Sequence, residues 1–197
     1  RERRCALLSD RFYEWQRGAT GSTPFYFPFV KPLYLGAIWA TVASGGLHRI
    51  RGGEVRAYGT KDGLPSDQPS ALLAARDGRL WVGTYTDGLA VGRDGVFTRV
   101  PLPPPAFASR DVRALVEDAG GSIWVGLLPG GVIRLRDGIA RRYGPAEGLP
   151  SDRTLSMISA RGGGVWVGTT AGLARSEEDR FRPFGRGDGL PDDRAQA

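Results

Sequence analysis

The chain has 197 residues, a formal net charge of +6 and a single cysteine, Cys5. One cysteine excludes an internal disulfide, no apolar run is long enough to span a membrane, and no signal peptide is visible. The positive charge is mixed with acidic residues along most of the chain, which is weak evidence for a nucleic-acid partner. The 30 glycines and 14 prolines fall at regular turn positions between apolar runs, a pattern that favours turn-rich all-β structure over disorder.

The first predicted unit, residues 1–35, has no internal periodicity. It contains RRCALLSDRFYEW followed by PFYF, a pattern that resembles the SOS-response-associated peptidase family, which processes abasic sites. Ser9–Arg11 stands where that family has Ala-Asp-Gly. The resemblance implies that Glu14 would be catalytic, since a carboxylate can shuttle protons, and that Trp15 would contact single-stranded DNA.

Two parts of that family's site are missing from this chain. The family's nucleophile is a cysteine at the mature N-terminus, whereas Cys5 matches an internal cysteine of the motif. The family also uses a later histidine, but His48, the only histidine here, falls in a strand predicted for the following unit. We therefore expect Glu14 to be non-catalytic, and abasic-site processing on single-stranded DNA is kept as the alternative function.

From residue 36 onward, four tryptophans recur at intervals of 42, 43 and 42 residues. They lie in closely similar peptides: Trp39 in GAIWATV, Trp81 in GRLWVGT, Trp124 in GSIWVGL and Trp166 in GGVWVGT. An internal repeat of this length implies a solenoid, a propeller or an array.

Each repeat contains short apolar runs separated by tight turns. In the unit that begins at Ser70, Asp-Gly pairs at 87–88 and 94–95 separate the last three runs. Asp-Gly between apolar runs predicts a hairpin, because a type I′ turn requires positive φ at both central residues. We predict four blades, the first without an obvious first strand, at residues 37–60, 68–100, 110–143 and 153–184.

A four-stranded sheet that is apolar on both faces must be covered on both sides, and radial stacking in a β-propeller does this. The predicted fold class is therefore all-β. It is a partial β-propeller of about three and three-quarter four-stranded antiparallel blades over residues 36–197, preceded by the non-repeat segment 1–35. We expect the tryptophans to fill the spaces between blades, and an arc of under four blades to expose faces that further blades would cover.

The connectors between blades carry a second motif. They read DGLPSD at 62–67, EGLPSD at 147–152 and DGLPDD at 188–193, whereas PPPAFASRD at 103–111 departs from the pattern. Together with the Gly-x-apolar-Trp-x-Gly-Thr frame, they resemble the two-component regulator propeller repeat over about residues 36–193. In that family, such repeats form the periplasmic sensor region of membrane-bound hybrid histidine kinases and typically sense carbohydrate breakdown products.

This resemblance implies a non-enzymatic sensory or ligand-binding module with no cofactor. The implied partners are a carbohydrate-like small ligand or a sensor kinase, and the implied location is periplasmic; under the peptidase alternative it would be cytoplasmic. Ligand contacts are not identified by the sequence, but we expect binding at the central mouth, where loops of several blades converge. The chain begins with Arg and ends within a repeat, so we expect a piece of a larger protein.

Carboxylates five residues apart in two connectors could suggest calcium sites. They are Asp62 with Asp67, and Glu147 with Asp152. The spacing lacks the alternating ligands of a known calcium loop. We therefore expect turns at these positions and no metal site.

Overall fold

The computed structural model describes residues 5–8, 11–18, 21–27, 29–33, 37–42, 46–102 and 111–190. Side chains are described at residues 38–41, 46–102 and 111–190. Within these ranges the chain is built of β-strands and short 3₁₀ turns, and no helix has the length and apolar character needed to cross a membrane.

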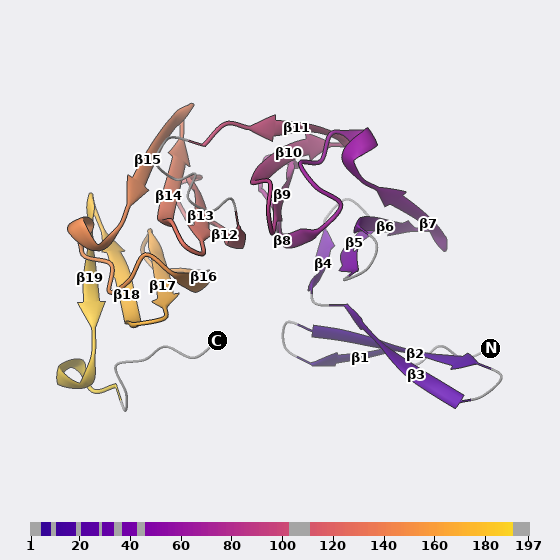
Figure 1. The fold of residues 1–197 in the computed structure, drawn as a ribbon, viewed down its shortest axis with the longest axis horizontal. Helices are drawn as coiled ribbons and strands as arrows, with labels where there is room; N and C mark the ends of the chain where they lie inside the picture. Colours follow the sequence, from indigo (N-terminus) through magenta and orange to yellow (C-terminus); the bar gives the residue numbers. More distant parts are fainter. Residues whose placement is uncertain are drawn as a thin grey trace.

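Four antiparallel sheets of four strands follow one another along an arc (Figure 1). We call them blades 1 to 4 and name each seam, the packed space between two neighbouring blades, by their numbers. Blade 1 comprises β4 (Phe29–Leu33), β5 (Ala37–Val42), β6 (Gly46–Arg51) and β7 (Glu54–Tyr58). Blade 2 comprises β8 (Pro69–Ala74), β9 (Leu80–Thr84), β10 (Leu89–Arg93) and β11 (Val96–Val100). Blade 3 comprises β12 (Val112–Glu117), β13 (Ile123–Leu127), β14 (Gly131–Arg136) and β15 (Ile139–Tyr143), and blade 4 comprises β16 (Thr154–Ser159), β17 (Val165–Thr169), β18 (Gly172–Glu177) and β19 (Arg180–Phe184).

The predicted fold class is confirmed, with one addition to the first blade. The sequence indicates only three strands there, but Phe29–Leu33 pairs with β5 and supplies the fourth. This strand comes from the segment that the sequence assigns to the non-repeat unit, so the arc holds about four blades rather than three and three-quarters. The predicted domain boundary at residue 35 stays a prediction.

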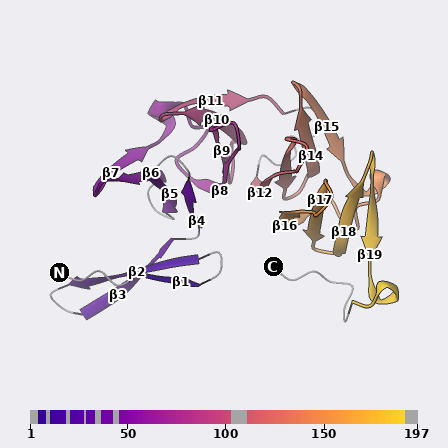
Figure 2. The same cartoon turned by 180° about the vertical axis from the view of Figure 1, so that it is seen from behind.

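The first strand of each blade lies on the concave side of the arc and the last strand on the convex side, as both views show (Figures 1 and 2). A separate three-stranded sheet of β1 (Cys5–Leu8), β2 (Arg11–Gly18) and β3 (Gly21–Phe27) precedes blade 1. Its strands β2 and β3 lie next to β4 and β5.

The predicted type I′ geometry is found at the Asp-Gly pairs of the outer hairpins but not at 87–88, where only Gly88 has positive φ. Asp94 and Gly95 both have positive φ, 55° and 87°, between β10 and β11. Asp137 and Gly138 repeat this geometry between β14 and β15, with φ of 50° and 77°. Positive φ at both central residues is the requirement of a type I′ turn, so these pairs set the register of the outer hairpins.

The predicted role of the tryptophans is confirmed for three of the four. Trp39 packs into the 1–2 seam, Trp81 into the 2–3 seam and Trp124 into the 3–4 seam, each at most 6% exposed. In each case the indole belongs to the earlier blade and contacts the later one. Trp166 points the same way from blade 4 and is only partly buried. The seams are thus the hydrophobic core of the arc.

Candidate functional site

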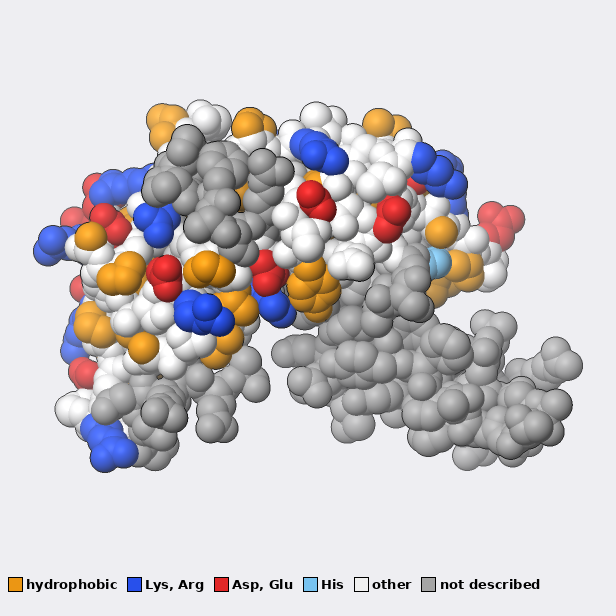
Figure 3. Space-filling model, viewed as in Figure 1, with side chains coloured by type: hydrophobic (Ala, Val, Ile, Leu, Met, Phe, Trp, Pro, Cys, Tyr) orange, Lys and Arg blue, Asp and Glu red, His pale blue; other side chains and the backbone are white. Residues whose placement is uncertain are grey.

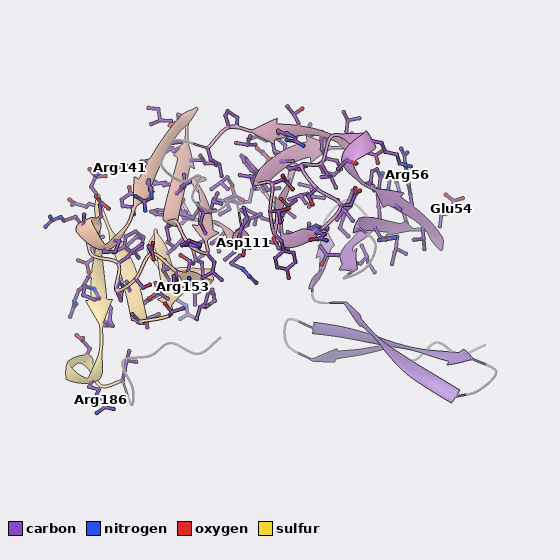
Figure 4. All side chains as sticks on the ribbon, viewed as in Figure 1. Glu54, Arg56, Asp111, Arg141, Arg153 and Arg186 are labelled. Carbon is purple, nitrogen blue, oxygen red and sulfur yellow. The ribbon has the colours of Figure 1, made fainter. Side chains whose placement is uncertain are left out.

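The concave edge of the arc collects polar side chains from three blades. Asp111 precedes β12, Arg113 lies within it, and Arg153 precedes β16. Tyr85 lies in the loop between β9 and β10. Figure 4 labels Asp111 and Arg153 on this inner side, beside the first strands of blades 3 and 4. We call Tyr85, Asp111, Arg113 and Arg153 the inner-edge cluster.

Within the cluster, an arginine joins an aromatic ring to a carboxylate. Arg113 Nη2 lies 2.9 Å from Asp111 Oδ2, and Arg113 Nε also donates to this oxygen at 3.1 Å. The guanidinium carbon lies 5.0 Å from the centre of the Tyr85 ring, within cation–π range. Tyr85 remains 42% exposed. The contacts therefore hold an aromatic face and a charged group together at an open edge.

Asp111 contributes a carboxyl whose charge is disfavoured. Burial raises its pKa above the ordinary value, and the neighbouring Arg113 offsets only part of this effect. The backbone of Asp111 also accepts a hydrogen bond from the amide of Leu128, which ties it to the loop after β13. The backbone that carries this carboxyl is therefore held to the loop after β13.

Blade 4 adds a hydroxyl pair beside the exposed Arg153. Ser151 Oγ lies 3.1 Å from Thr170 Oγ1, and the Arg153 amide donates to Ser151 Oγ at 3.1 Å. The Thr170 amide donates to the carbonyl of Arg153, which joins the loop between β17 and β18 to the entry of β16. Blades 2 and 3 thus meet through the Tyr85–Arg113 contact, and blade 4 presents Arg153 on the same concave side. Ligand binding at this edge stays a prediction.

A hollow lies in the 3–4 seam, at the other end of β12 from the inner-edge cluster. It has a volume of about 360 Å³, and its lining includes Asp118, Arg134, Ser176 and Glu178. Burial alone would raise the pKa of Asp118. Hydrogen bonds from Trp124 Nε1 (2.8 Å) and the Ser122 amide (2.9 Å), with the charge of Arg134, outweigh burial and hold the pKa below its usual value. Asp118 therefore stabilises the seam, and both of its oxygens are already engaged.

The outer edge of blades 3 and 4 is charged with both signs. Figure 3 shows basic and acidic side chains alternating there, at the left of the view. Arg141 of β15 pairs with Asp179 in the last turn of blade 4, and Arg136 lies 3.4 Å from Asp137. Charged side chains on an outermost strand disfavour pairing with another sheet edge, so this edge suits contact with solvent.

The sequence-predicted site residues are not brought together with the inner-edge cluster. Glu14 and Trp15 lie on β2, where the register sets Glu14 opposite Cys5 and Phe25. Their side chains lie outside the described residues, so their predicted roles stay predictions. His48 is a half-buried residue of β6, opposite Ala40.

Three of the four connector carboxylates accept hydrogen bonds from backbone amides of their own loop. Asp62 accepts from the Gly59 amide at 2.9 Å, Asp67 from Thr60 at 2.7 Å and Glu147 from Gly144 at 2.7 Å. These bonds close the 3₁₀ turns Thr60–Asp62 and Pro145–Glu147. In the described part of the chain, no group of three or more His, Cys, Asp or Glu residues could hold a metal ion.

Sequence reasoning missed the inner-edge cluster because its members share no motif. Tyr85 and Arg113 are separated by 28 positions, and neither position repeats in the other blades. The sequence predicts binding at the central mouth, because loops of several blades meet there, but this argument does not identify the residues involved.

Comparison with known proteins supports the propeller and leaves the peptidase resemblance unsupported. Residues 63–86 match the model of the family described as two component regulator propeller. No curated protein matches the chain. The matched segment runs from the connector before blade 2 to the loop of Tyr85.

Solved structures share the fold at low identity. The extracellular domain of a B. thetaiotaomicron protein described as a hybrid two component system superposes with a TM-score of 0.74 and 15% identity, covering 93% of this chain and 28% of that one. Virginiamycin B lyase from Staphylococcus aureus gives 0.67 at 15% identity, covering 89% of this chain and 63% of the lyase. This chain therefore spans less than a third of the first structure and under two thirds of the second.

Proposed function

We propose that this chain is part of a sensory β-propeller that binds a small ligand without transforming it, in the input region of a two-component hybrid histidine kinase. The family-model match and the likeness to extracellular domains of hybrid two-component systems support the sensory role. A periplasmic location accords with those neighbours and belongs to the same proposal. The likeness to the lyases is one of fold and carries no reaction to this chain.

The observation that carries the proposal is the Tyr85–Arg113–Asp111 contact at the concave edge. An exposed aromatic face beside fixed hydrogen-bonding groups suits a ligand that is flat on one side and polar at its rim. A sugar ring has both properties, so we propose a carbohydrate-like ligand. Arg113 would donate to its oxygens, while Tyr85 would pack against its C–H face.

A binding experiment tests this assignment directly. A panel of neutral and acidic oligosaccharides is titrated into the protein by calorimetry, and the Tyr85→Ala variant is compared with Val96→Ala. Val96 is 74% exposed and begins β11 on the convex side, so it controls for the loss of an exposed apolar side chain. We expect Tyr85→Ala to weaken binding by about tenfold or more at unchanged melting temperature, and Val96→Ala to leave affinity unchanged.

Two outcomes would count against the proposal. Binding that survives Tyr85→Ala would place the ligand elsewhere, and a panel without any binder would remove the carbohydrate class. A covalent product with abasic single-stranded DNA, abolished by Glu14→Gln, would favour the peptidase alternative instead.

A further inference from the structure

The outer hairpin of blade 3 presents three arginines to the 3–4 seam. Arg134 of β14 lies directly opposite Arg141 of β15, and Arg136 lies two positions further along β14, on the same face of the sheet. Like charges at directly opposed positions destabilise a strand pair. Blade 2 has Val91 and Thr98 at the two opposed positions. The fold of a blade therefore does not require the arginine pair.

Blades 1 and 4 share the arginine pair, and in blade 3 a hollow lies beside it. The hollow has a volume of about 240 Å³, and the three arginines line it together with Tyr143, Asp137 and Asp179. Figure 4 labels Arg141 on the convex side of the arc, away from the inner-edge cluster. Pockets for drug-sized ligands begin at about 300 Å³, so this hollow suits a small group.

The charges around this hollow do not cancel. Arg141 is committed to Asp179, whose carboxylate and carbonyl oxygen both accept from it. Arg136 lies 3.4 Å from the carboxylate of Asp137, which is 85% exposed, so water weakens this pair. Three guanidiniums thus meet two carboxylates, and one of the two carboxylates is held only loosely.

Arg134 has a fixed guanidinium with spare donors. Its Nε donates to Ser122 Oγ at 3.1 Å, and its guanidinium carbon lies 5.3 Å from the centre of the Trp124 ring. The nearby Asp118 carboxylate accepts from the indole and from the Ser122 amide. No described residue accepts a hydrogen bond from the two terminal nitrogens of Arg134, so these remain available to a ligand.

The hydroxyl of Tyr143 provides a second, independent observation. The residue is 1% exposed, and its oxygen has no hydrogen-bond partner among the described residues, which costs free energy. In the 1–2 seam, the corresponding Tyr58 hydroxyl points to a turn of the next blade, because a Cβ on Gly95 would lie 2.8 Å from it. The strand registers put Asp179 at the turn position of Gly95. The Tyr143 hydroxyl therefore lies on the side of the hollow that Asp179 lines.

We propose that this hollow binds a tetrahedral oxyanion, a phosphate or sulfate group, between Arg134, Arg136 and the Tyr143 hydroxyl. Three donors on separate side chains suit a group with three terminal oxygens, whereas a carboxylate has only two. Guanidinium nitrogens match the geometry of such oxygens, and the anion would offset the excess positive charge. The site lies on the convex side and is independent of the ligand proposed at the concave edge.

Binding of inorganic phosphate tests the proposal. Phosphate is titrated by calorimetry into the full chain and into two variants, with chloride used to hold the ionic strength constant. Arg136→Gln removes an exposed guanidinium, and Tyr143→Phe removes the hydroxyl but keeps the ring. Two controls make the same changes elsewhere: Arg93→Gln at the equivalent position of blade 2, and Tyr58→Phe in the 1–2 seam.

We expect Arg136→Gln and Tyr143→Phe each to weaken phosphate binding by about tenfold, because each loses a hydrogen bond to a charged group. Both controls should keep the affinity of the parent. A similar loss in Arg93→Gln would show that phosphate responds only to net charge, and a similar loss in Tyr58→Phe would place the anion in the 1–2 seam. Either result, or a parent that binds no phosphate, would overturn the site.

The melting temperature separates lost binding from lost folding. Without phosphate, Tyr143→Phe should melt no lower than the parent, because it removes a buried hydroxyl that has no partner. Added phosphate should raise the melting temperature of the parent clearly more than that of the variant. A Tyr143→Phe variant that melts lower without phosphate would show that the hydroxyl serves the protein alone, which would contradict its role as a donor to the anion.

Three further anions define the ligand class. Sulfate should bind as phosphate does, and acetate should bind clearly more weakly. Acetate that binds as tightly as phosphate would overturn the tetrahedral group in favour of a carboxylate. Glucose 6-phosphate distinguishes two sources that both support the site: tighter binding than phosphate indicates a group carried on a larger molecule that contacts the exposed Ile139 in the lining, and weaker binding indicates a free anion.

Discussion

The 2–3 and 3–4 seams join equivalent blades by different chemistry. In the 2–3 seam, Arg76 of blade 2 donates from Nε and its amide to the Glu117 carboxylate, at 3.1 and 2.8 Å, and the packing around Trp81 is aliphatic. In the 3–4 seam, three aromatic rings interlock and Trp124 donates to Asp118. The repeat thus fixes where a seam forms, while a few side chains decide what stabilises it.

Removing the ring of Phe181, which packs between Trp124 and Tyr143 of blade 3, should cause the largest loss of stability. The strand register puts Ala140 of blade 3 at the position that Phe181 holds in blade 4. Phe181→Ala therefore gives the 3–4 seam the alanine that the 2–3 seam has, but leaves Trp124 and Tyr143 facing a cavity. We expect a loss of about 3–5 kcal/mol in the free energy of unfolding, measured by urea denaturation. Phe184→Ala removes the same side chain from the face of blade 4 on which Ile158 is exposed. It should lower the free energy of unfolding by about 1 kcal/mol, since that ring is only partly buried.

A similar loss in the two variants would contradict the idea that the 3–4 seam depends on the inserted ring. A double-mutant cycle that combines Phe181→Ala with Tyr143→Val isolates the edge-to-face contact between these two rings. We expect a coupling free energy of about 0.5–1.5 kcal/mol between Tyr143 and Phe181.

The sequence predicts the fold well because the repeat carries local signals. Asp-Gly turns and the tryptophan frame specify strands and seams from nearest neighbours, and these predictions are confirmed for the outer hairpins at 94–95 and 137–138 and for three of the four tryptophans. The strand Phe29–Leu33 escaped detection because it resembles no other first strand, and pairing with β5 alone places it. The inner-edge cluster escaped for another reason: Tyr85 and Arg113 meet only when two blades are stacked.

Weakening the Asp118–Trp124 hydrogen bond should cause the next largest loss of stability, and this loss should depend on pH. Asp118→Asn replaces a charged acceptor that binds the Ser122 amide and the indole, both in a buried site. We expect a loss of about 1–3 kcal/mol at pH 7. Unfolding by urea at a series of pH values measures it.

The direction of the pH effect follows from the lowered pKa of Asp118. Its carboxylate stabilises the fold above the unfolded-state pKa, about 4, and this contribution is lost as pH falls through the lower, folded-state value. The variant should therefore lose less stability than the parent on acidification through this window. A parallel decline in both proteins would show that Asp118 has no part in the acid response.

The smallest expected effect is a gain in stability in the 2–3 seam, where the tryptophan has no carboxylate partner. Trp81 Nε1 is buried with no acceptor among the described residues, and Ala75 holds the turn position that Asp118 holds in blade 3. Ala75→Asp should supply the missing acceptor and raise the unfolding free energy by about 1 kcal/mol, because a buried donor would gain a charged partner. Ala160→Asp is the matched control. It adds the same carboxylate beside Trp166, which is only partly buried and whose Nε1 is not a buried atom without a partner, so its effect should be near zero. A destabilised Ala75→Asp variant would mean that burying the carboxylate in the 2–3 seam costs more free energy than the hydrogen bond to Trp81 contributes.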